Sequence, residues 1–136
     1  MTPARPCRRG SAVLEAALVL PILLCLAFGT VEFAHFYFIK HNLQGAARQG
    51  ARAAIPAGAT NNDVNHAIAE TMTAAGLGSG AYTITTNPAD IAAAEQGEDV
   101  TVTVQCNWGT VGLRPMALIS ADKTVTGAVV MRKEGN

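Results

Sequence analysis

The hydrophobic positions of this chain form one long unbroken run, followed by short segments with regular patterns. Sixteen residues, from Ala16 to Val31, pass without a charge, and the aromatic-rich residues 33–39 extend the run. A membrane-spanning helix needs about 20 mostly apolar residues. Residues 11–39 supply that length, which predicts a transmembrane helix with Glu15 and Glu32 near its two ends.

The helical pattern continues in residues 40–55, beyond the apolar run. Four residues there fall on one stripe of a helix: Leu43, Ala47, Ala51 and Ala54. Pro56 blocks continuation because the residue before a proline leaves the helical region. One helix from Ala12 to Ile55 is therefore expected, about 66 Å long at roughly 1.5 Å per residue. Pro21 removes one of its backbone hydrogen bonds and is predicted to kink it.

A second helix is predicted over residues 62–75. Its apolar face recurs at helical spacing, in Val64, Ile68, Met72 and Ala75. Asn61 or Asn62 is expected to cap this helix, and Gly76 is expected to end it. Three small residues of the first helix would let it approach closely: Gly45, Ala46 and Gly50. The alternative is that they lie on a weakly amphipathic surface.

The rest of the chain alternates between apolar and polar residues. This alternation predicts three strands, over residues 81–86, 99–106 and 123–132. They suit an antiparallel sheet with one face covered by helix 41–55 or by helix 62–75. The expected fold class is α+β, a long N-terminal helix followed by a small domain over residues 56–136. The short apolar stretch Met116–Ile119 is interpreted as core, with a loop that contacts the membrane or a partner as the alternative.

Charge changes this picture through the placement of the basic residues. The formal net charge is zero, so the bulk charge gives no argument for a nucleic-acid partner. Arg5, Arg8 and Arg9 precede the apolar run, and Lys40, Arg48 and Arg52 follow it. Basic residues favour the cytoplasmic side of a membrane helix, and the first set lies closer to the run. A cytoplasmic N-terminus and a C-terminal domain outside the cytoplasm are therefore expected.

Candidate catalytic and metal-binding residues do not form a recognisable set. The cysteines, Cys7, Cys25 and Cys106, fall before, within and after the apolar run, so no intramolecular disulfide is expected. The spacing of His35, His41 and His66 is not that of metal ligands. No nucleophile, base and orienting group occur together as a motif. The chain is therefore predicted not to be an enzyme, and no cofactor or metal is expected.

The C-terminal end of the apolar run contains a second acidic residue, Glu32. Glu32 is predicted to mark the far membrane interface, or else to pair with His35 three residues later.

A secretory signal would have an apolar core of only about 7–15 residues and a small-residue cleavage site. This run is longer and no A-x-A sequence follows it, so cleavage by ordinary signal peptidase is the weaker interpretation.

The start of the run resembles the class III signal of type IV pilins and pseudopilins. Gly10 ends a short basic leader, Glu15 is the fifth residue after it, and Pro21 lies within the hydrophobic helix. Two stretches are similar to the TadE-like proteins of the tight-adherence (Flp) pilus system, namely "RRGSAVLEAALVLPILLCLAFGTVEF" and "LQGAARQGARAA". The resemblance covers residues 8 to about 55. It departs at Ala16, where the family more often has Phe or Tyr, and at Ser11, where type IV pilins have an N-methylated Phe.

The resemblance implies a minor pseudopilin that acts in the assembly of Flp pili. A prepilin peptidase would cut between Gly10 and Ser11, while Arg8 and Arg9 hold the leader, residues 1–10, in the cytoplasm. The mature protein would stay in the bacterial inner membrane until other pseudopilins and platform proteins recruit it. Glu15 would then pair with the new amino group of Ser11, in its own chain or in a neighbouring subunit. The alternative is an uncleaved single-pass envelope protein with a small periplasmic binding domain.

Overall fold

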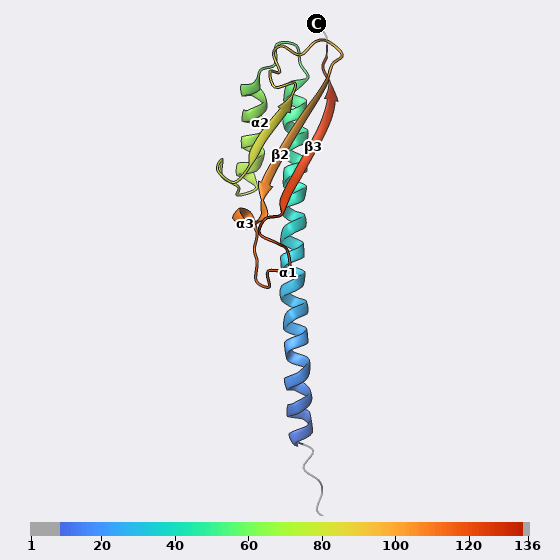
Figure 1. Ribbon diagram of the computed structural model, residues 1–136, viewed down its shortest axis with the longest axis vertical. Coiled ribbons are helices and arrows are strands. Elements are labelled where there is room, and N and C mark those ends of the chain that lie inside the picture. Colours follow the sequence, from blue (N-terminus) through green and yellow to red (C-terminus); the bar gives the residue numbers. More distant parts are fainter. Residues whose placement is uncertain (1–8, 135–136) are drawn as a thin grey trace, which may run out of the picture.

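One long helix dominates the molecule. The computed structural model describes residues 9–134, apart from the side chain of Arg9. Helix α1 spans Arg9–Ala54, 46 residues, and continues through Pro21, which confirms the single long helix. It ends two residues before Pro56, as the restriction on pre-proline residues requires. Figure 1 shows the N-terminal half of α1 projecting away from a small domain that packs on its C-terminal half.

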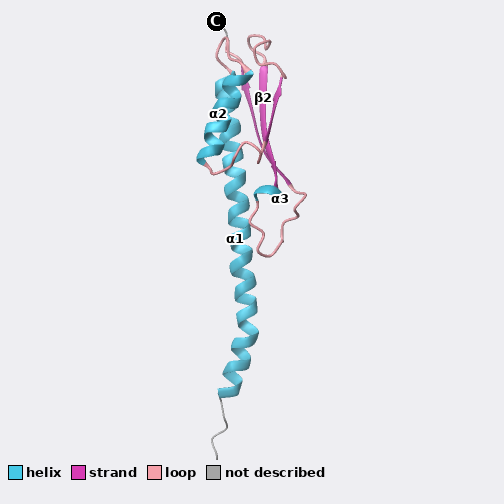
Figure 2. Ribbon diagram, turned by 90° about the vertical axis from the view of Figure 1, so that its left-hand side faces the viewer, coloured by secondary structure: helices cyan, strands magenta, loops and turns pink. Residues whose placement is uncertain are grey.

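Helix α2, Asn61–Ala74, lies along the C-terminal half of α1 (Figure 2). Its N-cap is Thr60, whose hydroxyl accepts a hydrogen bond from the backbone N–H of Asp63. The Asp63 carboxylate in turn accepts from the backbone N–H of Thr60 at 2.8 Å, which completes a capping box. Gly76 follows the helix at a φ of +77°, as expected for a glycine that ends a helix.

The expected caps of α2, Asn61 and Asn62, were wrong by one or two residues. Asn61 is already inside the helix, and its side chain bonds elsewhere. Its Nδ2 donates to the carbonyl of Ala89, and its Oδ1 accepts from the N–H of Ile91, each at 2.8 Å. The amide therefore fastens a loop of the domain to the start of α2 instead of capping the helix.

The domain contains one antiparallel sheet of three strands: β1 (Thr83–Asn87), β2 (Asp99–Asn107) and β3 (Thr124–Arg132). The strands lie in the order β1-β2-β3, with Ile84 opposite Val104 and Val104 opposite Gly127. This confirms the predicted sheet and the α+β class. The alternation also predicted the inner face of β2, where Val100, Val102, Val104 and Cys106 are all buried.

Helix α1 contacts β2, β3 and α2, so its C-terminal part is the element that covers the sheet. Glycines allow two close crossings. A Cβ at Gly127 would lie 2.5 Å from the carbonyl carbon of Leu43, and a Cβ at Gly50 would lie 2.6 Å from Cδ1 of Ile68. The predicted close approach of helices is thus confirmed at Gly50. A Cβ at Gly45 would meet nothing within 4 Å, so that glycine serves no such contact.

A one-turn helix, α3 (Trp108–Val111), follows β2, and residues 112–123 then run as a loop beside α1 before β3 begins (Figures 1 and 2). The sequence pattern did not predict α3. Trp108 is fully buried, and its ring lies 5.7 Å from that of His35 and 5.3 Å from that of Phe36, between centroids. The aromatic contacts fasten this end of the domain to the middle of α1.

Candidate functional site

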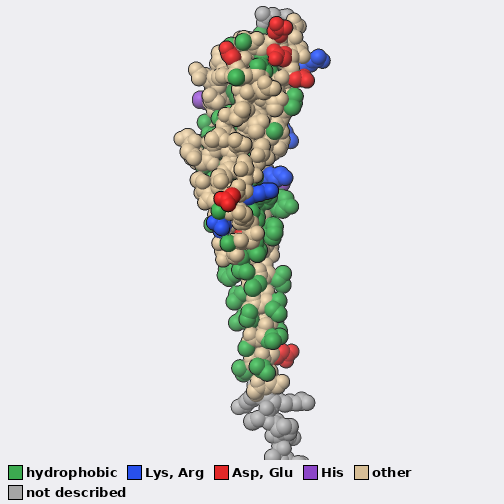
Figure 3. Space-filling view, in the orientation of Figure 1, with side chains coloured by type: hydrophobic (Ala, Val, Ile, Leu, Met, Phe, Trp, Pro, Cys, Tyr) green, Lys and Arg blue, Asp and Glu red, His purple; other side chains and the backbone are tan. Residues whose placement is uncertain are grey.

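The N-terminal part of α1 lies outside the domain with its apolar side chains exposed. Residues 10–28 are all exposed. An 18-residue window of the helix has a mean hydropathy of 2.4, and only 6% of that window is buried. Figure 3 shows hydrophobic side chains gathered around this part of the molecule. A helix this long and apolar fits a single-pass membrane protein.

The residues predicted for processing lie at the start of that exposed helix. Gly10 and Ser11 are in the first turn of α1 and exposed, and a Cβ at Gly10 would meet nothing within 4 Å. Glu15 is exposed about one turn farther along. Arg9 is the first helical residue, and residues 1–8 of the leader, Arg8 among them, lie outside the described residues. The Gly10–Ser11 bond is open to solvent, and an enzyme that cuts an extended chain must first unwind this turn.

Glu32 is buried where α1 meets the loop of residues 112–123, with 0% of its side chain exposed. Its Oε1 accepts a hydrogen bond from the backbone N–H of Ile119 at 2.8 Å, and its Oε2 accepts one from that of Met116 at 3.3 Å. A buried carboxylate requires such partners because desolvating an unpaired charge is strongly unfavourable. The carboxylate therefore fastens the loop to the helix.

The partners of Glu32 differ from the one that helical spacing suggested. His35 is directed to another group, since its Nε2 bonds with the carbonyl oxygen of Val111 at 3.0 Å. Because a carbonyl oxygen only accepts, that contact requires a proton on Nε2. Glu32 and His35 thus both hold the segment that joins β2 to β3, from neighbouring turns of α1. No local sequence signal could reveal this, because Glu32 and Ile119 are 87 residues apart.

The interpretation of Met116–Ile119 as core was wrong for most of the stretch. Met116 is 36% exposed and Leu118 is 54% exposed, and only Ile119 packs against the core. The reason lies in the backbone, which faces Glu32 here and leaves the side chains of Met116 and Leu118 at the surface. The alternative, a loop that contacts the membrane or a partner, is the one that this exposure favours.

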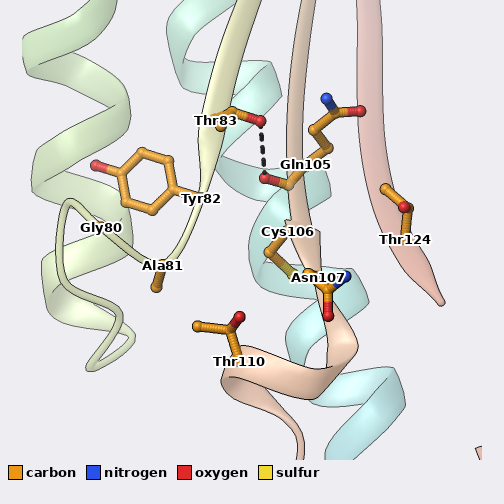
Figure 4. A pocket seen from close by; sticks show the side chains of 9 residues that line it. All are labelled: Gly80, Ala81, Tyr82, Thr83, Gln105, Cys106, Asn107, Thr110 and Thr124. Atoms are coloured by element: carbon orange, nitrogen blue, oxygen red, sulfur yellow. Dashed lines mark hydrogen bonds between the residues drawn. The ribbon is translucent and has the colours of Figure 1, made fainter. Parts of the chain in front are cut away.

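A separate small hollow of about 260 Å³ lies at the end of the sheet near α3 (Figure 4). It is lined by Gly80, Ala81, Tyr82, Thr83, Gln105, Cys106, Asn107, Thr110 and Thr124. Burial raises the pKa of the Cys106 thiol, so the thiol stays protonated and is a weak nucleophile. The other polar side chains there carry hydroxyl and amide groups, which donate and accept hydrogen bonds.

The remaining candidates for chemistry lie apart from one another. Between residues 9 and 134, no three His, Cys, Asp or Glu side chains form a group that could hold a metal ion. The two cysteines in that range, exposed Cys25 on α1 and buried Cys106 on β2, are both free thiols. Cys7 lies outside the described residues.

Comparison with known proteins bears on α1. The family model described as TadE-like protein matches residues 10–52, which is nearly the whole of that helix. No curated protein and no solved structure matches the chain. The α+β domain beyond residue 52 lies outside the match. The match confirms the resemblance seen in the sequence: residues 10–52 of this chain are similar to TadE-like proteins, and that family suggests involvement in tight-adherence (Flp) pilus systems.

Proposed function

We propose that this chain is a minor pseudopilin of a tight-adherence (Flp) pilus system. Helix α1 anchors it in the bacterial inner membrane, with the N-terminus in the cytoplasm and the domain in the periplasm. A prepilin peptidase cuts between Gly10 and Ser11, and the mature protein then acts in pilus assembly with other pseudopilins and platform proteins. The TadE-like match carries this proposal, because it begins at Gly10 and runs along the exposed apolar helix.

The surroundings of the cleavage site support processing. Neither Gly10 nor Ser11 packs against the domain, so a membrane-embedded peptidase can reach the bond between them. The first N–H groups of a helix have no partner within the helix, so unwinding this turn breaks few hydrogen bonds. Gly10 lowers the free-energy cost of unwinding this turn further, because glycine favours a helical conformation less than every residue except proline.

Glu15 supports a role in assembly once the leader is gone. Cleavage would create a positive amino group on Ser11 at the start of a helix, where the helix dipole disfavours positive charge. An ionised carboxylate in the centre of a bilayer costs about 2.5–3.5 kcal/mol on insertion scales, and less near its edge. Because Glu15 is fully on the surface of α1, the amino group of a neighbouring subunit can reach it as well as that of its own Ser11. Pairing offsets both penalties.

Processing tests the proposal directly. The full-length chain is expressed in bacteria with and without an active prepilin peptidase, and the N-terminus is sequenced. We expect Ser11 as the first residue only when the peptidase is active, and we expect Gly10→Val to block the cut. Gly78→Val is the matched control, since Gly78 is exposed in a loop and a Cβ there meets nothing within 4 Å.

An intact leader on the wild-type chain, while a known prepilin is cut in the same cells, would refute the pseudopilin assignment. The chain would then be an uncleaved single-pass envelope protein with a small periplasmic domain.

A further inference from the structure

The loop between α3 and β3 holds an unusual concentration of exposed apolar side chains. Within the described residues beyond α1, four large hydrophobic side chains are exposed, and three of them are in this loop. These three are Leu113 at 55%, Met116 at 36% and Leu118 at 54%. A small domain rarely clusters such side chains in one loop unless another apolar phase or partner covers them.

Two contacts with α1 fix the position of this loop along the axis of the helix. The Glu32 carboxylate holds the backbone N–H groups of Met116 and Ile119. One turn below, Gly29 has no side chain, and Leu118 occupies the space beside it, where a Cβ of residue 29 would lie 3.4 Å from Leu118 Cδ1. The tip of the loop is therefore beside residues 29–32 of α1.

This position coincides with the end of the membrane span. About 20 helical residues cross the hydrocarbon core of a bilayer, and counted from Ser11 they end at Thr30. Phe33, Tyr37 and Phe38 are each about half exposed on the next turns, where aromatic side chains favour the interface. The tip of the loop thus lies at the level where hydrocarbon meets headgroups.

The charges around the loop suit the same boundary. Arg114 is exposed in the loop itself, and Lys40 and Lys123 are exposed close to the same end of the domain. Figure 3 shows basic and acidic side chains at the lower end of the domain, directly above the hydrophobic part of the helix. Basic side chains at this level meet the phosphates of anionic lipids.

A groove of about 660 Å³ is lined by Leu118 and one face of α1, and joins the loop to the membrane segment. Its lining is almost entirely apolar and includes residues of α1 between Ile22 and Tyr37, together with Leu118. All of these residues except Leu118 belong to α1. The groove therefore opens to whatever surrounds the membrane-spanning helix, and its apolar lining suits an acyl chain.

From these placements we infer that loop 112–119 inserts into the outer leaflet of the bilayer. Leu113, Met116 and Leu118 lie among the ends of the acyl chains nearest the headgroups, an acyl chain occupies the groove beside Leu118, and Arg114 contacts lipid phosphate. The domain then has two attachments to the membrane, α1 and the loop. The inference rests on the proposed function only in taking α1 to span a membrane.

Depth-dependent quenching tests the insertion. The full chain, with Cys7 and Cys25 replaced by serine and the buried Cys106 replaced by alanine, receives single cysteines as Leu113→Cys or Leu118→Cys, each labelled with bimane. The chains are reconstituted in vesicles of phosphatidylethanolamine and phosphatidylglycerol whose acyl chains are brominated either near the carbonyl or near the middle of the chain. Leu23→Cys on α1 is the membrane control, and Thr126→Cys on the exposed face of β3 is the aqueous control. The emission of Trp108, the single tryptophan, reports that each variant is folded.

We expect bromine near the carbonyl to quench both loop labels, bromine near the middle of the chain to quench the Leu23 label, and neither lipid to quench the Thr126 label. Quenching at Leu23 without quenching at either loop position would overturn the inserted loop and leave the membrane helix intact. The loop would then contact water, if iodide quenches it, or a protein partner, if iodide does not. An unquenched Leu23 label would instead overturn the membrane span of α1, and with it both proposals.

Discussion

The carboxylate of Glu32 and the backbone N–H of Ile119 lie 2.8 Å apart, across 87 residues of sequence. Because Glu32 also accepts from Met116, a single side chain of α1 holds two backbone groups of the loop that precedes β3. The pair links the apolar helix to the loop that leads into the last strand.

Glu32→Ala is expected to release the loop from α1, because it leaves two backbone N–H groups of the loop without their acceptor. The amides of Met116 and Ile119 should exchange with solvent about tenfold to a hundredfold faster, as the loss of a hydrogen bond to a charged acceptor implies. Hydrogen exchange on the full chain in detergent measures this. Glu70→Ala is the matched control, since Glu70 is exposed on α2. Unchanged exchange at both amides would contradict the assigned contact.

Gly127→Ala is expected to destabilise the domain by about 1–3 kcal/mol, the usual range for overpacking. Its Cβ would lie 2.5 Å from the backbone of Leu43, and backbone cannot move aside as a flexible side chain can. Gly45→Ala is the opposite case, since a Cβ there meets nothing within 4 Å. That change should stabilise helix α1 by up to about 1 kcal/mol. Urea unfolding of the full chain in detergent compares the two, and equal midpoints would contradict the close crossing of β3 and α1.

Asp63 is expected to make the stability of α2 depend on acid pH. The hydroxyl of Thr60, and then its backbone N–H, lower the pKa of the Asp63 carboxyl below its ordinary value of 3.8. A lowered folded-state pKa means that the stabilisation is complete above the unfolded value and disappears as pH falls through the folded value. Thermal unfolding between pH 5 and pH 2 should therefore decline less steeply for Asp63→Asn than for the wild type. Identical pH profiles would remove the capping role of the ionised carboxylate.

The two described cysteines are expected to be unreactive in vesicles for different reasons. Cys25 is exposed on the part of α1 that we place in lipid, and Cys106 is buried in the domain with a raised thiol pKa. In a Cys7→Ser chain, neither a membrane-permeant nor a charged maleimide should label Cys25 or Cys106 in intact vesicles, because a thiol in lipid or in the protein core stays protonated. Both reagents should label both thiols after denaturation in detergent. Labelling of Cys25 by the charged reagent in intact vesicles would place that turn of α1 in water.

Glu15→Ala is expected to permit cleavage after Gly10 and to impair pilus assembly. The peptidase must recognise the bond itself, whereas the carboxylate has its partner only after the cut has created an amino group. Counting pili by electron microscopy, together with N-terminal sequencing of the same cells, separates the two steps. Glu15→Asp keeps the charge and should retain part of the assembly. Normal piliation with Glu15→Ala would remove this account of the charge.

Most of the fold was predictable because its signals are local. The apolar run gave α1, the spacing of Val64, Ile68 and Met72 gave α2, and the alternating valines of residues 99–106 gave β2. The cap of α2 was missed because Thr60, Asn61 and Asn62 are all good capping residues. Only the folded structure shows that Asn61 bonds to Ala89 and Ile91, which leaves the cap to Thr60.

The candidate site was predictable only in part, for a physical reason. The spacing of Gly10 and Glu15 could be read from the sequence, and their role in processing stays a prediction. The partners of Glu32 could not be found, since its hydrogen bonds go to backbone groups, which every sequence has. The apolar stretch Met116–Ile119 was misassigned to the core because hydrophobicity shows that a side chain avoids water and does not show which apolar surroundings it enters.

Helix α1 carries the exposed apolar segment and the core residues Ile39 and Leu43 on one unbroken rod. The domain consequently has no hinge to its anchor. If the helix turns about its own axis or slides along it, the sheet turns and slides with it by the same amount. The direction in which the domain faces is thus set by how the helix packs among its neighbours. A force that moves α1 along its axis moves the domain with it by the same distance.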